Sequence, residues 1–196
     1  MDHSSHLSKE RPDNGRTTII RLLNKQLADT LDLRSQARQS YFNVRGPYSQ
    51  ELRSLFDGLA RDLRHFADLI AQRIVGAGGY AVATVRSVAQ ESGLRDYPVD
   101  VLDAHDQLEA LLSSYSRYEL DTHHNLKAAR EIGDSATVDV LQVISVSIEN
   151  DLWFLEAYLE GIVVGLHGRK LPVWTSTLSN QRRTDQSESA ASSGTA

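Results

Sequence analysis

Apolar residues return every three or four positions in four long segments of this chain, and this spacing constrains its fold most strongly. Such spacing places apolar side chains on one face of an α-helix, which must pack against another element. No segment alternates apolar and polar residues over any length, so no β-sheet is predicted. The segments span about residues 20–42, 52–74, 108–132 and 141–159. Together they predict an all-α fold, a four-helix bundle.

Breaks between the segments refine this prediction. Glycine and proline stop the first three helices near positions 46, 76 and 133. The third helix opens with Asp100 as its predicted N-cap. The crossover at 81–98 is long enough for a short helix at about 84–91. A crossover of this length predicts the ferritin-like connection rather than a simple up-and-down bundle.

Composition excludes several classes of protein. The 196 residues suffice for one domain, and there is no cysteine for a disulfide or a thiolate metal site. No apolar run approaches the roughly 18 residues that span a bilayer, and the N-terminus has no signal-peptide core, so a cytoplasmic protein with no membrane partner is predicted. The net charge of −5 gives no overall attraction to nucleic acid. We expect a tail at 1–16, the bundle at 17–165 and a mostly disordered tail at 166–196.

Two carboxylates on the second predicted helix, Asp57 and Asp68, lie eleven residues apart. At about 1.5 Å per residue they are separated by roughly 16 Å, so they cannot bind the same ion within one chain. Eleven residues are also close to three whole turns, which places both on the same side of the helix. Two copies crossing antiparallel could bring Asp57 of one against Asp68 of the other. This polar stripe is therefore a predicted dimer interface.

Several motifs around this stripe resemble those of the Dps family, the mini-ferritins named DNA-binding proteins from starved cells. Segment 41–47 reads Tyr-Phe-Asn-Val-Arg-Gly-Pro, where the family reads roughly His-Trp-Asn-Val-x-Gly-Pro. Further matches follow in order: Leu-Arg-Asp-Tyr-Pro at 94–98, Ala-Arg-Glu-Ile-Gly-Asp at 129–134 and Leu-Trp-Phe-Leu-Glu-Ala at 152–157. The resemblance covers about residues 17–162.

The resemblance implies a hollow homododecamer with two ferroxidase centres shared across each dimer interface. Family members oxidise Fe²⁺ with hydrogen peroxide or oxygen and store ferric oxide in the cavity, which protects DNA. Iron is thus the expected cofactor, and nucleoid association is an option if DNA is bound. The five ligand positions, which the family fills with His, His, Asp, Asp and Glu, hold here Tyr41, Arg53, Asp57, Asp68 and Gln72.

These substitutions leave two interpretations of the centre. Asp57 and Asp68 suit Fe²⁺, and Gln72 offers only a neutral carbonyl oxygen. Tyr41 presents a phenol, a poor Fe²⁺ ligand while it is protonated, and Arg53 repels a cation. In the first interpretation a modified centre still oxidises iron. In the second, arginines pair with the carboxylates and leave a non-enzymatic, salt-bridged cage or DNA-associated stress protein. Those arginines are Arg53, Arg61 and Arg64.

Charged residues elsewhere supply a candidate pore and candidate DNA contacts. Asp134, Asp139 and Glu131 are the acids of the three-fold pores that the resemblance implies; alternatively, Asp134 and Asp139 are acids favoured at a helix N-terminus. Arg182 and Arg183 in the C-terminal tail are the candidate DNA contacts.

Histidine and aromatic residues complete the predictions. His65 is either an additional nitrogen ligand or a residue at the edge of the core. The His123-His124 pair is expected to be solvated surface rather than a metal site. Trp153 and Phe154 fall within the fourth apolar stripe, and both are predicted to be core residues.

Overall fold

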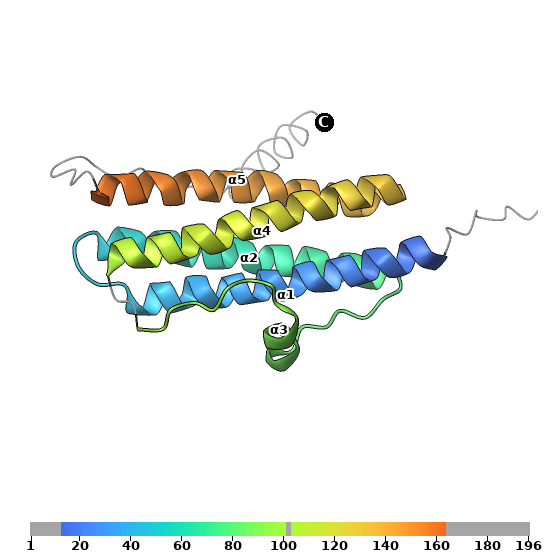
Figure 1. The fold of residues 1–196 in the computed structure, drawn as a ribbon, viewed down its shortest axis with the longest axis horizontal. Helices are drawn as coiled ribbons and strands as arrows, with labels where there is room; N and C mark the ends of the chain where they lie inside the picture. The colour runs from blue at the N-terminus through green and yellow to red at the C-terminus, as the bar shows by residue number, and fades with distance from the viewer. Residues whose placement is uncertain (1–12, 101–102, 164–196) are drawn as a thin grey trace, which may run out of the picture.

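The computed structural model describes residues 13–100 and 103–163, and within them it contains five α-helices and no strand. Four long helices lie side by side, and a short helix stands outside them (Figure 1). The predicted all-α four-helix bundle is confirmed, and the crossover does contain a short helix. No described helix is apolar over enough of its length to span a membrane. The helices are α1 (Asp13–Asn43), α2 (Ser49–Gly76), α3 (Val85–Glu91), α4 (Ala104–Ile132) and α5 (Ser135–Val163).

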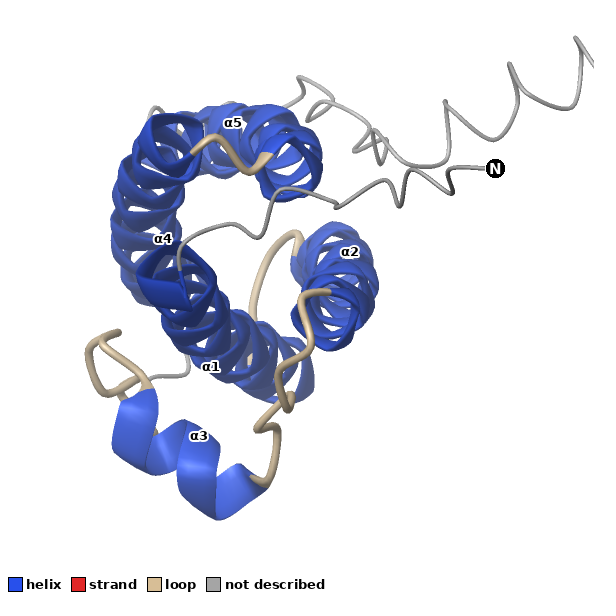
Figure 2. Cartoon of the chain, turned by 90° about the vertical axis from the view of Figure 1, so that its right-hand side faces the viewer, coloured by secondary structure: helices blue, strands red, loops and turns tan. Residues whose placement is uncertain are grey.

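The bundle is built from two helical hairpins, α1–α2 and α4–α5. Each hairpin turn contains a glycine in the left-handed backbone region, Gly46 with φ 91° and Gly133 with φ 77°. A residue with a Cβ atom adopts this region only with strain, so these glycines favour reversal of the chain at these points. Seen along the bundle, α1 lies between α2 and α4, and α3 stands beside α1 (Figure 2).

Side chains cap the starts of α3 and α4. Thr84 Oγ1 accepts a hydrogen bond from the Ser87 backbone N–H at 3.3 Å. The N-cap of α4 is Asp103, whose carboxylate accepts from the His105 backbone N–H at 2.8 Å. The prediction of Asp100 as this cap is therefore wrong. Both acids precede the same apolar stripe, and the apolar pattern alone does not distinguish between them.

The apolar stripes meet in one core that contains fully buried aromatic residues, among them Phe56 and Phe66. Burying one such side chain contributes about 1.5–3 kcal/mol. The prediction that Trp153 is a core residue is wrong, because its side chain is 56% exposed, whereas Phe154 is 6% exposed. One helical step of about 100° turns Trp153 away from the core that Phe154 fills.

Buried polar side chains link α1 to α4 inside this core. Gln26 Nε2 donates to Thr122 Oγ1 at 2.8 Å, and the hydroxyls of Thr30 and Tyr118 share a hydrogen bond of 2.7 Å. Burial raises the pKa of Tyr118 to about 12, although hydrogen bonds with Thr30 and Gln26 act in the opposite direction. The Tyr118 phenol therefore keeps its proton at neutral pH.

Polar contacts also fasten the crossover to α1. The Asp29 carboxylate accepts from the Gly93 backbone N–H at 2.7 Å and from Lys25 Nζ at 2.6 Å. Nearer the end of α1, the hydroxyls of Ser40 and Tyr97 share a hydrogen bond of 2.8 Å. These contacts hold the chain along α1 between the two hairpins.

Candidate metal centre

The Asp57 carboxylate on α2 lies between two arginines. Arg38 on α1 donates an Nη1–H to Asp57 Oδ1 at 2.9 Å. Arg61, one turn further along α2, places its Nε 3.6 Å from Asp57 Oδ2. Each carboxylate oxygen thus faces a different guanidinium group. The cluster is partly open to solvent, since the Asp57 side chain is 42% exposed and that of Arg38 33% exposed.

Two aromatic rings hold Arg38 in this position. Its guanidinium carbon lies 4.4 Å from the centroid of the Tyr41 ring and 4.6 Å from that of Phe42. These residues follow Arg38 by three and four positions, so one helical turn brings the three side chains together. A cation–π contact at an exposed site contributes about 0.5–1 kcal/mol. The aromatic side chain at the first ligand position therefore contacts a cationic group of its own chain.

The charges around Asp57 oppose metal binding within one chain. Two guanidinium groups beside one carboxylate leave the cluster with a net positive charge. A dication at Asp57 would have to displace Arg38 and approach Arg61, against electrostatic repulsion. Exposed ion pairs contribute only about 0.2–1 kcal/mol to stability, so the cluster should affect cation binding more than folding. These donors therefore fit Fe²⁺ poorly.

Of the three arginines predicted to pair with the α2 carboxylates, only one contacts such a carboxylate within the described chain. Arg61 does lie beside Asp57. Arg53 instead donates an Nη2–H to the carbonyl oxygen of Val44 at 3.4 Å, in the turn that joins α1 to α2. Arg64 is exposed and forms no ion pair with any residue in the described ranges. Arg38 is not predictable from the sequence as the partner of Asp57, because it lies on another helix and only the register of the hairpin brings the two together.

The other predicted ligands lie further along α2. Asp68 and Gln72 are exposed, and neither forms a hydrogen bond or ion pair within the part of the chain that the structure describes. They are one helical turn apart, so both point to the same side. His65 is half-buried, with its ring centroid 6.5 Å from that of Phe66. A single chain therefore presents an arginine-bound carboxylate at Asp57 and an unpaired one at Asp68.

The predicted pore acids differ in their surroundings. Asp134 is buried and accepts from Arg73 Nη2 at 2.7 Å and from the Thr137 backbone N–H at 3.1 Å. Its carboxylate thus caps α5 and ties it to the end of α2, which favours the helix N-terminus interpretation for this residue. Asp139 and Glu131 are exposed, as a pore role would require.

The predicted DNA contacts cannot be placed. Arg182 and Arg183 both lie outside the described residues. Their contact with DNA stays a prediction from the sequence.

A further group of titratable side chains lies in the bundle core, comprising Asp62, Tyr115 and Asp151 from three different helices. Burial, followed by the charges of Asp151 and Asp62, raises the pKa of Tyr115 well above its ordinary value. The phenol is therefore neutral at physiological pH and is not available as a phenolate ligand. No sequence pattern predicts this group, because its members lie on separate helices and share no motif.

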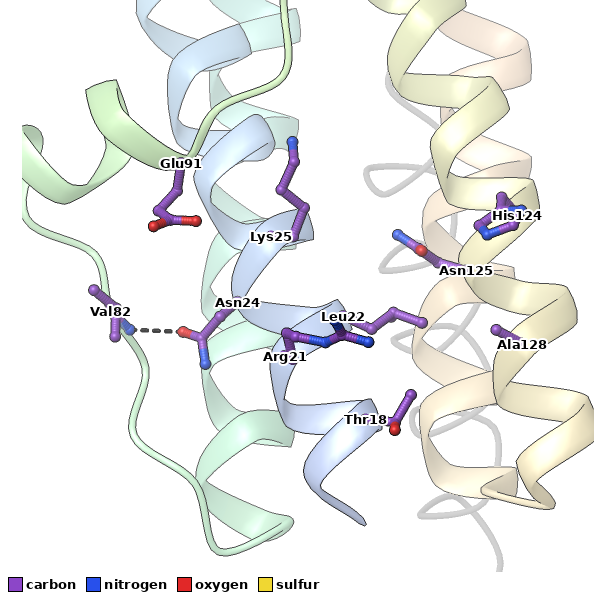
Figure 3. Close-up of a pocket in the computed structure, with 10 residues that line it drawn as sticks. All are labelled: Thr18, Arg21, Leu22, Asn24, Lys25, Val82, Glu91, His124, Asn125 and Ala128. Carbon is purple, nitrogen blue, oxygen red and sulfur yellow. Dashed lines mark hydrogen bonds between the residues drawn. The ribbon is translucent and has the colours of Figure 1, made fainter. Parts of the chain in front are cut away.

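A groove of about 660 Å³ lies between α1, α4 and the crossover (Figure 3). Arg21 and Lys25 line it from α1, His124 lines it from α4, and Glu91 contributes a charge of opposite sign. Lys25 lies thirteen residues before Arg38, or about 20 Å along the helix. The groove is therefore separate from the Asp57 cluster.

Comparison with known proteins places these features in a family. A family model described as a ferritin-like domain matches residues 20–163. The DNA protection during starvation protein of Agrobacterium fabrum is 32% identical over 157 residues, which are 80% of this chain and 97% of that protein. A structure of Dps from Mycobacterium smegmatis in a tetragonal form has a TM-score of 0.73 and 25% identity, covering 78% of this chain and 92% of that chain. The crystal structure of a Dps protein from Bacillus brevis has the same fold, with a TM-score of 0.72 and 24% identity over 76% of this chain and 99% of that chain.

Proposed function

This chain belongs to the Dps family of ferritin-like proteins, and we propose that it stores iron in a cage whose interfacial ferroxidase position is filled by Arg38. Membership of the family supports the general role of an iron-storing mini-ferritin. The Arg38–Asp57 pair supports the more specific statement, because the Arg38 guanidinium group already binds the carboxylate that iron would need as a ligand.

The proposed assembly is a homododecamer in which the interface places α2 of one chain against α2 of a second copy. The eleven-residue spacing of Asp57 and Asp68 supports this, since the two can meet only between chains. Both side chains lie at or near the surface of the single chain. Twelve chains of 21.8 kDa give about 262 kDa. Light scattering on the purified protein should find this mass, and a stable monomer would contradict the proposal.

In this dimer, Asp68 of a second copy would approach Arg38 and Arg61 of the first. Attraction between its carboxylate and their guanidinium groups would then stabilise the seam without a metal. Among the two interpretations from the sequence, this arrangement favours the salt-bridged cage over a modified ferroxidase. Iron would enter the cavity and be oxidised slowly there, and not at a fast centre between subunits.

An anaerobic Fe²⁺ titration followed by oxygen or hydrogen peroxide tests this proposal. We expect no rapid phase of oxidation and no saturation at a fixed number of ions per interface site, while slow formation of a ferric core continues. Rapid oxidation that saturates near about two Fe²⁺ per site would instead establish a modified ferroxidase. The unpaired Asp68 is the observation that favours this second candidate.

Protection of DNA would follow from iron removal, because Fe²⁺ and peroxide together generate hydroxyl radicals. Relatives carry the name DNA protection during starvation protein. The net charge of −5 gives this chain no general attraction to phosphate. We therefore propose protection without tight DNA binding. A gel shift at low salt should show free DNA, and retardation that weakens as salt rises would contradict this.

A further inference from the structure

A histidine of α4 lies between two glutamates on the surface of the bundle. His123 Nε2 is 3.7 Å from Glu119 Oε1 on the same helix and 3.5 Å from Glu149 Oε1 on α5. One ligand atom from each of the three residues can be chosen so that all lie within 4.8 Å of one another. From the sequence, His123 is expected to be solvated surface, because the second glutamate comes from another helix and is not evident near it in the chain.

The geometry of this cluster matches the needs of a single metal ion. Two ligand atoms about 2.0–2.2 Å from a tetrahedrally coordinated ion are roughly 3.4 Å apart. The two nitrogen–oxygen distances, 3.7 and 3.5 Å, are close to this separation. Both carboxylates also approach the same ring nitrogen, so one ion in front of Nε2 could contact all three residues with little movement.

The helices that carry these ligands are firmly packed. Tyr118 and Thr122 on α4 and Ile148 on α5 are buried beside the cluster, which fixes the two backbones relative to each other. Glu149 Oε1 also accepts a hydrogen bond from Ser145 Oγ at 3.2 Å. Such a contact orients a carboxylate before a metal arrives. The Glu119 and His123 side chains need only the ordinary i, i+4 spacing of a helix to converge.

A second histidine cluster shows what a poorer arrangement looks like. His105 faces Asp106 through Nδ1 at 3.2 Å and Glu109 through Nε2 at 3.9 Å. These three residues also offer ligand atoms within 4.8 Å of one another, but their two contacts are made to different ring nitrogens, whereas both glutamates of the His123 cluster approach the same nitrogen. All three residues also lie in the first turns of α4, with no ligand from another helix.

We propose that Glu119, His123 and Glu149 bind a divalent first-row transition metal ion, with Zn²⁺ held more tightly than Fe²⁺ or Mn²⁺. One imidazole nitrogen and two carboxylate oxygens suit this class of ion, and the general order of affinity places Zn²⁺ above the other two. The exposure of His123 and Glu149 leaves room for water at the remaining coordination positions. This site uses no residue of the Asp57 cluster and therefore does not depend on the proposed ferroxidase chemistry.

Calorimetric titration of the chelator-treated, full-length protein with ZnCl₂ tests the site. His123→Asn should lose one Zn²⁺ per chain, or bind it at least about tenfold more weakly. His124→Asn and His105→Asn remove neighbouring or comparable histidines and should keep the wild-type isotherm at this site. Asp121→Asn, which removes a carboxylate of α4 outside both this cluster and the Asp57 cluster, should keep it as well.

A crystal soaked in ZnCl₂ gives an independent readout. We expect an anomalous difference peak in front of His123 Nε2, and its loss in Glu149→Gln, whose amide is nearly the same shape as the carboxylate. Equal isotherms for wild type and His123→Asn would overturn the proposal. A soaked crystal with no anomalous density at His123 would do the same.

Discussion

Two arginine–aspartate pairs connect elements of this bundle, and they differ in burial. Arg38–Asp57 joins α1 to α2 with 33% and 42% of the two side chains exposed. Arg73–Asp134 joins α2 to the start of α5 with 16% and 5% exposed. From the sequence, Asp57 is a candidate ligand of a ferroxidase centre, and Asp134 is either a pore acid or an acid at a helix N-terminus. In each case an arginine from another element already holds the carboxylate.

From the difference in burial we infer which pair stabilises the fold and which one affects cation binding. An ion pair that is shielded from water leaves an uncompensated charge when one partner is removed. A pair open to water is screened and is easily replaced by hydration. We therefore expect Asp134 to matter for stability and Asp57 to matter for cation binding.

The largest expected effect is on stability at the buried pair. Asp134→Ala should lower the free energy of unfolding by about 3–5 kcal/mol. It removes the cap of α5 and the carboxylate that neutralises the largely buried Arg73 guanidinium, which is left with the neutral Thr137 hydroxyl. Urea unfolding at fixed protein concentration measures this. If the free energy of unfolding fell by no more than the roughly 0.2–1 kcal/mol expected for an exposed pair, the proposed difference between the two pairs would be wrong.

The buried contact between Thr30 on α1 and Tyr118 on α4 gives a second, intermediate effect on stability. The pKa of Tyr118 is about 12 in the folded chain, against about 10 for an ordinary tyrosine. As the pH rises, the unfolded chain therefore loses this proton before the folded chain does. The free energy of unfolding should fall by about 2–3 kcal/mol between pH 10 and 12, and Tyr118 should not change it below pH 10. Tyr118→Phe should reduce this alkaline loss in unfolding experiments at several pH values. An unchanged pH profile would contradict the assignment.

The smallest expected effect on stability is at the exposed pair. Asp57→Asn should change the free energy of unfolding by only about 0.2–1 kcal/mol, because water and the remaining contacts of Arg38 compensate for the lost charge. Asp121→Asn is a matched control, since Arg117 Nε lies 2.8 Å from that carboxylate on an exposed face of α4. A loss as large as that of Asp134→Ala would show that Asp57 is part of the structural core.

The sequence predicts the helices well because their signals are local. Apolar periodicity and the glycines near positions 46 and 133 suffice for the four long helices and their turns. The error at Asp100 arose between two acids of equal capping ability, three residues apart. The error at Trp153 arose because an apolar residue at the edge of a stripe has the same periodicity whether it faces the core or solvent.

The candidate sites are less predictable because they depend on contacts between helices. Asp57 and Asp134 were found from their motifs, but their partners Arg38 and Arg73 belong to no motif. Only the register of packed helices brings these arginines to the carboxylates. For the same reason the contact between His123 and Glu149 is not predictable from the sequence, since the two lie twenty-six positions apart, on either side of a hairpin turn.

The most direct test of the central claim compares Fe²⁺ oxidation in two rebuilt proteins. Tyr41→His, Arg53→His and Gln72→Glu together restore the ligand types implied by the family, and the second protein adds Arg38→Ala. We expect the triple variant to stay slow while Arg38 holds Asp57, and the quadruple variant to oxidise Fe²⁺ about 10–100-fold faster. Equal, fast oxidation by both proteins would contradict the claim that Arg38 blocks this position.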